Sequence, residues 1–89
     1  MTNIVINYDP FAMESQILIT GVDGTQGTTY SNSELSQLAE TIALRAYEFG
    51  VNDTKVFVRA PKVFYDKLVS YVRAAQNTYS LSDINMEIL

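Results

Sequence analysis

Alternating apolar and polar residues dominate the first third of the chain. Residues 3–8 alternate between an apolar and a mixed face, which predicts a β-strand. Residues 16–22 predict a second strand, and residues 28–30 begin a short third one. The Asp23-Gly24 dipeptide between the last two is a turn sequence, because glycine accepts backbone angles that other residues avoid.

Apolar residues recur at helical spacing in two later segments. The first predicts a helix that starts at the capping-box pair Ser31 and Glu34 and stops at Gly50. Its predicted buried stripe consists of Leu35, Leu38, Ala39, Ile42, Ala46 and Phe49. The second helix follows Pro61 and ends at Gln76-Asn77. Its predicted buried stripe consists of Phe64, Leu68, Tyr71, Val72 and Ala75.

Two further strands complete the predicted pattern. Residues 55–59 have a continuous apolar centre, which is typical of a strand covered on both faces. Leu81 begins a last strand, in which apolar and polar residues alternate again. The order β-β-β-α-β-α-β predicts a single α/β domain over residues 1–89, with a mixed sheet of about five strands. This order suits a ribonuclease H-like fold with three layers and helices on both faces of the sheet.

The composition excludes several kinds of chemistry. The 89 residues include no Cys and no His, so disulfide frameworks, thiol nucleophiles, serine triads and His-ligated metals are excluded. No apolar run approaches the roughly 20 residues of a membrane span, and the N-terminus lacks a signal-peptide pattern. We therefore expect a soluble, cytoplasmic protein that is not an enzyme, with no cofactor, no metal site, no membrane contact and no small-molecule substrate.

Charged residues are segregated along the chain, although the net charge is -4. Residues 1–44 carry five acidic residues and no basic one. Residues 45–73 carry all six basic residues against three acidic ones, and residues 74–89 carry two acidic residues. Such asymmetry can make one face attractive to anions, but the favoured interpretation is ordinary solvated charge on a helix and a strand.

Two catalytic or nucleotide-binding arrangements are incomplete. A two-metal nuclease needs carboxylates that converge on the ions, but the predicted strand that could support Asp9 ends in Arg59 and Ala60. Asp9 is therefore interpreted as a turn residue. The glycines in residues 21–27 lead into a strand rather than into a helix, so a hairpin turn is favoured over a phosphate-binding loop.

Binding residues are the remaining candidates. Basic residues around the second helix could contact RNA phosphates, and so could hydroxyls after the predicted hairpin. These RNA- or anion-binding candidates are Arg59, Lys62, Lys67, Arg73, Ser31 and Ser33. A loop with exposed apolar residues would instead indicate a protein contact, although packing beneath the sheet is an equal alternative. The protein-contact candidates are Phe11, Met13, Glu14 and Tyr65.

Several segments, taken in order, resemble the small-subunit ribosomal protein S-eleven family. The segments are residues 17–24, 29–33, 36–50, 55–61 and 80–85. The resemblance implies a ribonuclease H-like sheet used without catalysis to bind ribosomal RNA and a neighbouring protein. The family's basic tails and its strong positive charge have no counterpart here. Carried over to this chain, the contacts implied are Ser31 and Ser33 after the hairpin, and Arg59 and Lys62 beside Pro61.

Two binding functions follow as hypotheses. In the first, the chain docks on structured RNA or a ribonucleoprotein surface through residues 55–73. In the second, it is a small acidic inhibitor or host-interaction protein of the phage type, whose acidic first 44 residues face a basic protein surface. A carboxylate nuclease is the third and least supported alternative. Arg59, Lys62, Lys67 and Arg73 gathered on one face would favour RNA, whereas interspersed basic residues together with a continuous acidic face would favour a protein partner.

Overall fold

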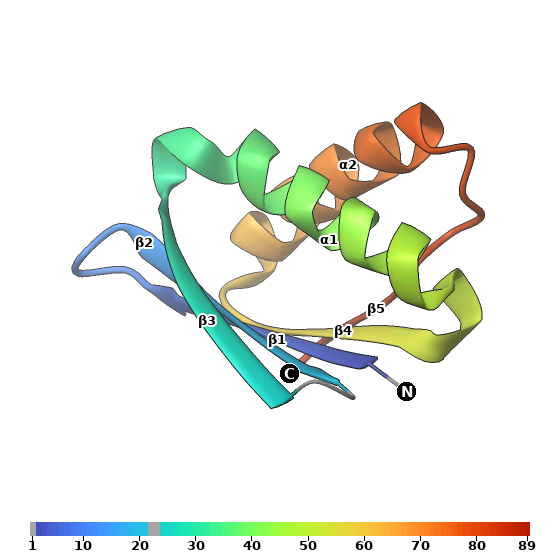
Figure 1. Cartoon of the computed structure of the whole chain (residues 1–89). Helices are drawn as coiled ribbons and strands as arrows, with labels where there is room; N and C mark the ends of the chain where they lie inside the picture. The colour runs from blue at the N-terminus through green and yellow to red at the C-terminus, as the bar shows by residue number, and fades with distance from the viewer. Residues whose placement is uncertain (1, 22–23) are drawn as a thin grey trace.

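A mixed sheet with two helices accounts for nearly all of the chain in the computed structural model, which describes residues 2–21 and 24–89 (Figure 1). The predicted α/β class and the five-stranded mixed sheet are confirmed. The strands are β1 (Thr2–Asp9), β2 (Glu14–Gly21), β3 (Gly24–Ser31), β4 (Thr54–Arg59) and β5 (Asn85–Ile88). The helices are α1 (Leu35–Phe49) and α2 (Lys62–Thr78), and short 3₁₀ turns precede α1 and β4.

The strands lie in the order β3-β2-β1-β4-β5. The β1–β2 and β2–β3 pairs are antiparallel, whereas β4 is parallel to both β1 and β5. Short connections can join only antiparallel neighbours, and a helix is long enough to return the chain to the start of a parallel strand. β1 consequently lies in the middle of the sheet, with partners on both sides.

Both helices lie on the same face of the sheet, side by side and in contact (Figure 1). The prediction of a three-layer arrangement is therefore wrong for the described residues, which form two layers. The reason lies in the strand order. The steps from β3 to β4 and from β4 to β5 run toward the same edge of the sheet, and right-handed crossovers in one direction leave their helices on one face.

The hydrophobic core lies between the helices and the sheet face that they cover. Ile4, Ile6, Ile17, Val56 and Val58 supply the sheet side and are almost completely buried. The predicted stripe of α1 is confirmed from Leu35 to Ala46, with Ala43 added to it and Phe49 half-buried.

The buried stripe of α2 differs from its prediction. Leu68 and Val72 are buried, but Tyr71 is 39% exposed because it stands beside α1 rather than above the sheet. Gln76, which was expected only to end the helix, is 3% exposed. The helix continues past it to Thr78, so a polar side chain occupies a core position of α2.

The opposite face of the sheet has no helix over it in the described part of the chain. Val5 pairs with Leu18 on one side and with Phe57 on the other, so three half-buried apolar side chains form a row across β2, β1 and β4. Lys55 and Arg59 lie two residues before and after Phe57, and therefore on the same face. We call this surface the uncovered sheet face.

Local signals define several element ends as predicted. Gly50 ends α1 with a φ of 96°, which a residue without Cβ adopts at little cost, and its N–H donates to the carbonyl of Ala46 at 2.9 Å. β3 starts earlier than predicted, at Gly24. Val22 of the second predicted strand and Asp23 of the predicted turn lie outside the described residues.

No helix within residues 2–21 and 24–89 combines the length and the apolar character that crossing a bilayer would require.

Candidate functional site

The connection between β1 and β2 carries the most exposed large apolar side chain among the described residues. β1 ends at Asp9, which pairs with Glu14 at the start of β2, so four residues (10–13) form the loop. The Phe11 side chain is 97% exposed and that of Met13 is 58% exposed. We refer to residues 9–14 as the hairpin tip.

The Asp9 carboxylate organises the hairpin tip. Its Oδ1 accepts hydrogen bonds from the backbone N–H of Phe11 at 2.9 Å and of Ala12 at 3.3 Å. Such a bond from an Asp side chain to the backbone two residues on fixes a turn, and Pro10 restricts φ in the same segment. The interpretation of Asp9 as a turn residue is confirmed.

The other end of the loop is tied to the body of the protein. Met13 has a φ of 53°, a left-handed conformation that is uncommon for residues other than glycine. Its carbonyl accepts a hydrogen bond from the N–H of Asn32 at 3.1 Å. The Asn32 side chain in turn donates to the Tyr8 hydroxyl at 3.2 Å. The hairpin tip is therefore held at both ends while its apolar side chains point to solvent.

A second exposed apolar residue lies at the same end of the sheet. The carboxyl ends of β1 and β4 coincide because these strands are parallel, and α2 starts three residues after β4. The rings of Tyr8 on β1 and Phe64 on α2 stack with centroids 4.4 Å apart. Val63, next to Phe64, is 82% exposed. The hairpin tip and the first turn of α2 thus present apolar side chains at one end of the molecule.

A polar depression of about 250 Å³ adjoins the hairpin tip. Its lining residues are Asn7, Tyr8, Asp9, Glu14, Gln16 and Thr29. Asp9 and Glu14 are its two charged side chains, so the depression is acidic. Residues 2–21 and 24–89 contain no group of three or more acidic side chains close enough together to hold a metal ion.

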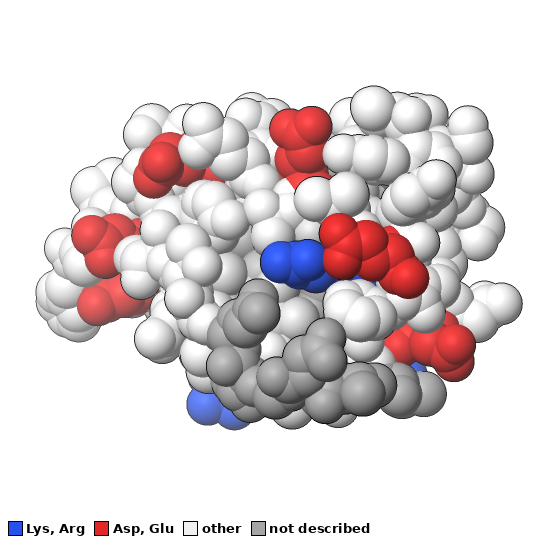
Figure 2. Space-filling model, in the orientation of Figure 1, with Lys and Arg blue, Asp and Glu red and all other residues white. Residues whose placement is uncertain are grey.

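The predicted RNA-binding residues do not form one surface. Arg59 lies on the uncovered sheet face, whereas Lys62 and Lys67 lie on exposed positions of α2. The Lys62 ammonium pairs with the Asp66 carboxylate at 3.0 Å. On the face shown in Figure 2, basic groups lie at separate points, and the one at the centre adjoins carboxylates.

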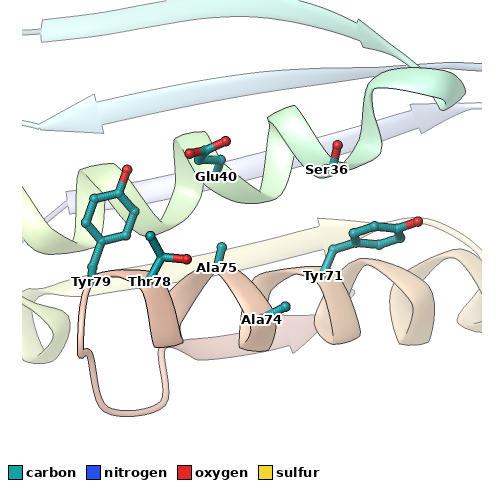
Figure 3. Close-up of a pocket in the computed structure, with 7 residues that line it drawn as sticks. All are labelled: Ser36, Glu40, Tyr71, Ala74, Ala75, Thr78 and Tyr79. Atoms are coloured by element: carbon teal, nitrogen blue, oxygen red, sulfur yellow. The ribbon is translucent and has the colours of Figure 1, made fainter.

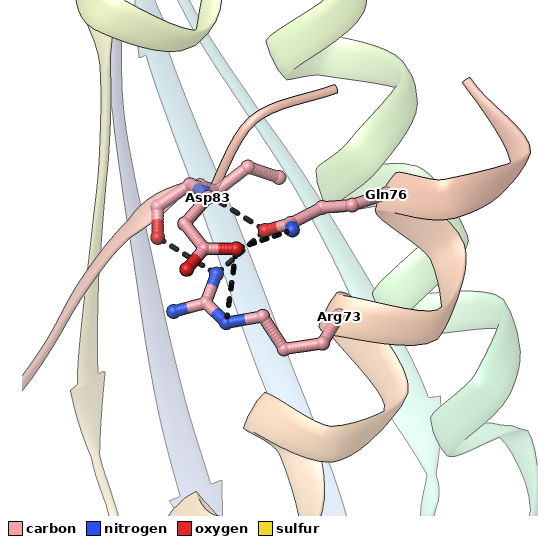
Figure 4. Close-up of polar contacts among 4 residues, drawn as sticks. Arg73, Gln76 and Asp83 are labelled. Atoms are coloured by element: carbon pink, nitrogen blue, oxygen red, sulfur yellow. Dashed lines mark hydrogen bonds and ion pairs between the residues drawn. The ribbon is translucent and has the colours of Figure 1, made fainter. Parts of the chain in front are cut away.

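Arg73 contributes to the internal connection between α2 and β5 (Figure 4). Its Nη1 donates to the side-chain oxygen of Gln76 and, at 3.0 Å, to the backbone carbonyl of Ile84. Its Nε lies 3.9 Å from the Asp83 carboxylate. The guanidinium therefore joins two elements of the fold, and sequence reasoning missed this role because it depends on residues ten and eleven positions away.

Ser31 and Ser33 belong to the cap of the turn before α1. The N–H and the hydroxyl of Ser31 both donate to the Glu34 carboxylate, at 2.9 and 3.0 Å, and the two serine hydroxyls are 2.9 Å apart. The hydrogen bond from the Ser31 backbone, followed by that from its hydroxyl, lowers the pKa of Glu34 from its ordinary value of 4.5. A carboxylate already occupies the donors that an anion would need.

Of the predicted protein-contact residues, three lie together. Phe11, Met13 and Glu14 all belong to the hairpin tip, whereas Tyr65 is half-buried and packs against the core. Val63 was missed, and its signal was an apolar residue outside the buried stripe of α2.

Comparisons with protein-family models, with curated proteins and with solved structures return no match to this chain.

Proposed function

We propose that this protein is a non-catalytic binding module that docks on a basic surface of a partner protein, with Phe11 as its anchor. A single observation carries this proposal: Phe11 is 97% exposed although its loop is held by hydrogen bonds at both ends. An apolar side chain that packs against nothing in its own chain, on an ordered support, has the properties of an interface anchor.

Pre-organisation strengthens such an anchor. Burying a phenylalanine side chain in a partner's pocket contributes roughly 1.5–3 kcal/mol. Ordering a flexible loop on binding would consume part of this gain, but Asp9 and Asn32 already hold the loop in place. Most of the gain therefore remains available for affinity.

The charge of the hairpin tip selects the kind of partner. Asp9 and Glu14 flank the loop, and no basic residue occurs before Arg45 in the sequence. A partner pocket with an apolar floor and a basic rim would complement this surface and would be reached faster by electrostatic attraction. A small acidic inhibitor or host-interaction protein fits this description.

Photo-crosslinking tests the proposal directly. The chain carries benzoylphenylalanine in place of Phe11 and is irradiated in a lysate of its own cells. We expect a protein adduct that excess unlabelled protein competes away, and that weakens with added salt. Phe11→Ser protein should compete poorly, whereas Leu44→Ser, which alters an exposed apolar residue in the second half of α1, should compete like the unmodified protein. Equal competition by both variants would refute the anchor role.

RNA binding is a second candidate, supported by a specific arrangement on the uncovered sheet face. Lys55, Phe57 and Arg59 share this face of β4, and Asn7 pairs with Arg59 on the neighbouring strand. An aromatic ring between two cations suits a stacked base with phosphates on either side. The RNA-contacting surface would then consist of Lys55, Phe57 and Arg59 on β4, without Lys62, Lys67 and Arg73.

Filter binding with structured RNA over a salt series tests this candidate. Lys55→Gln combined with Arg59→Gln should weaken binding and flatten the salt dependence, because two phosphate contacts are lost. The absence of binding to any RNA at low salt would reject it.

We also propose that the sheet is a two-layer form of the ribonuclease H-like fold that the family resemblance implies. The antiparallel meander β1-β2-β3, continued by the parallel strands β4 and β5 on the other side of β1, supports this assignment. A shared fold carries no activity with it, and the carboxyl end of β4 offers Arg59 rather than a second carboxylate beside Asp9.

A further inference from the structure

A groove lies between α1 and α2 on the helical face of the protein, with a volume of about 230 Å³ (Figure 3). α1 contributes Ser36 and Glu40 to it. The α2 side consists of Tyr71, Ala74, Ala75, Thr78 and Tyr79. Neither the hairpin tip nor the uncovered sheet face shares a residue with this groove.

The groove has a tyrosine near each end and small side chains between them. Figure 3 shows Tyr71 and Tyr79 at opposite ends of the α2 side, with the small side chains of Ala74 and Ala75 between them. Tyr79 packs against the core, and its ring centroid lies 5.7 Å from that of Tyr47. One aromatic end of the groove is therefore fixed before any ligand arrives.

Glu40 gives the groove its charge. No hydrogen bond or ion pair to its carboxylate occurs within the described residues, and no basic side chain lines the groove. Arg45, the basic residue of α1, pairs with Glu48 at 3.0 Å and does not neutralise Glu40. An anionic ligand would meet an unpaired negative charge here, and a neutral apolar ligand would bury that charge without a partner.

We propose that this groove binds an arginine side chain of a peptide segment. A guanidinium can pair with a carboxylate through parallel N–H donors while its flat face stacks on a tyrosine ring. The hydroxyl of Ser36, at the Tyr71 end of the groove (Figure 3), can accept a remaining donor. The methylene stem of the arginine can lie over the small side chains of Ala74 and Ala75. This site is independent of the Phe11 anchor, so either can fail without the other.

A titration of the full chain followed by ¹H–¹⁵N NMR tests the proposal. The probe is the blocked peptide acetyl-Ala-Arg-Ala-amide, and the control probe has citrulline, which is neutral and of the same shape, in place of arginine. We expect saturable shifts at the amides of Glu40, Ala74 and Thr78 with the arginine peptide, and at least fivefold weaker binding of the citrulline peptide. Shifts scattered over the surface, or equal binding of both peptides, would overturn the proposal.

Matched variants locate the charge that matters. Glu40→Gln should weaken binding about fivefold, the range of an exposed ion pair. Glu87→Gln removes the same charge from β5, away from the groove, and should leave binding unchanged. Equal losses in the two variants would mean that only net charge attracts the peptide and would overturn the site. Tyr71→Leu, which removes the ring but keeps an apolar side chain, should weaken binding severalfold without lowering the melting temperature by more than a few degrees.

Discussion

Two connections in this protein are both held in a fixed conformation, but they serve different purposes. The hairpin tip leads from β1 into β2, and residues 79–84 lead from α2 into β5. Each contains one residue other than glycine with a left-handed backbone, Met13 with a φ of 53° and Ser80 with a φ of 56°. Each such residue costs roughly 1 kcal/mol, so both connections need compensating contacts.

The compensating contacts differ in what they bury. In residues 79–84, Tyr79 and Leu81 pack against the core, and Ile84 is 1% exposed. The hairpin tip is held by hydrogen bonds alone and leaves Phe11 in solvent. Order in the first connection therefore stabilises the fold, whereas order in the second presents a side chain to a partner.

The largest effect on stability is expected at Gln76, which joins α2 to β5 (Figure 4). Its side-chain oxygen accepts from the N–H of Ile84 at 2.8 Å, and its nitrogen donates to Asp83 at 3.0 Å. Gln76→Leu keeps the volume but leaves a buried N–H without a partner, so unfolding by urea should show a loss of about 2 kcal/mol. Asn77→Leu, at the exposed neighbouring position, should change stability little. Equal losses of stability in the two variants would show that the hydrogen bonds of Gln76 do not specifically stabilise the junction of α2 and β5.

This position also marks where sequence reasoning reached its limit. The sequence predicts Gln76 only as the end of a helix. Its structural role is not predictable locally, because its partners Asp83 and Ile84 come close only once β5 has joined the sheet. Local signals fared better: the capping box at Ser31, the stop at Gly50 and the turn at Asp9 each depend on neighbours within a few residues, and each is present in the structure.

Surface properties were harder to predict for the same reason. The clustering of basic residues in residues 45–73 suggested a single patch, but a strand and a helix distribute them over different faces. Arg59 lies on the uncovered sheet face, and Arg73 is part of the α2–β5 junction. The sequence does not decide whether Phe11 is exposed, because the direction of the loop depends on the hydrogen bonds of Asp9 and Asn32.

A smaller effect is expected when the hairpin tip loses its organising carboxylate. Asp9→Ala removes the acceptor for two backbone N–H groups that water can partly replace, so the cost should be about 1 kcal/mol. Amide hydrogen exchange should become faster at Phe11 and Ala12 but not in the core strands. Asp9→Asn retains the side-chain oxygen and should preserve slow exchange. Fast exchange in both variants would show that the charge, not the turn geometry, holds the loop.

No loss of stability is expected when the anchor itself is removed. Phe11→Ser should leave the free energy of unfolding within about 0.5 kcal/mol of its original value, because the side chain packs against nothing in its own chain. Urea unfolding measures this, with Leu68→Ala as the contrast, since Leu68 is completely buried. A large loss of unfolding free energy for Phe11→Ser would show that Phe11 stabilises the fold. The hairpin tip would then not differ from the α2–β5 connection in this respect.

A last effect depends on pH and links the cap of α1 to the hairpin tip. Ser31 lowers the pKa of Glu34, and the N–H of the next residue, Asn32, holds the carbonyl of Met13. A carboxyl group whose pKa is lower in the folded state stabilises that state above its ordinary value of 4.5, and this contribution disappears as the pH falls through the lowered value.

Glu34→Gln isolates this contribution. The difference in melting temperature between the unmodified protein and the variant should be constant near about pH 6 and should shrink as the pH falls below 4.5, the ordinary pKa of the group. In the unmodified protein, hydrogen exchange at Asn32 should accelerate over the same range after correction for its intrinsic pH dependence, because the cap that positions this residue weakens. A difference in melting temperature that stays constant down to low pH would show that the Ser31 bonds do not depend on the charge of Glu34. The hairpin tip would then be held independently of the cap.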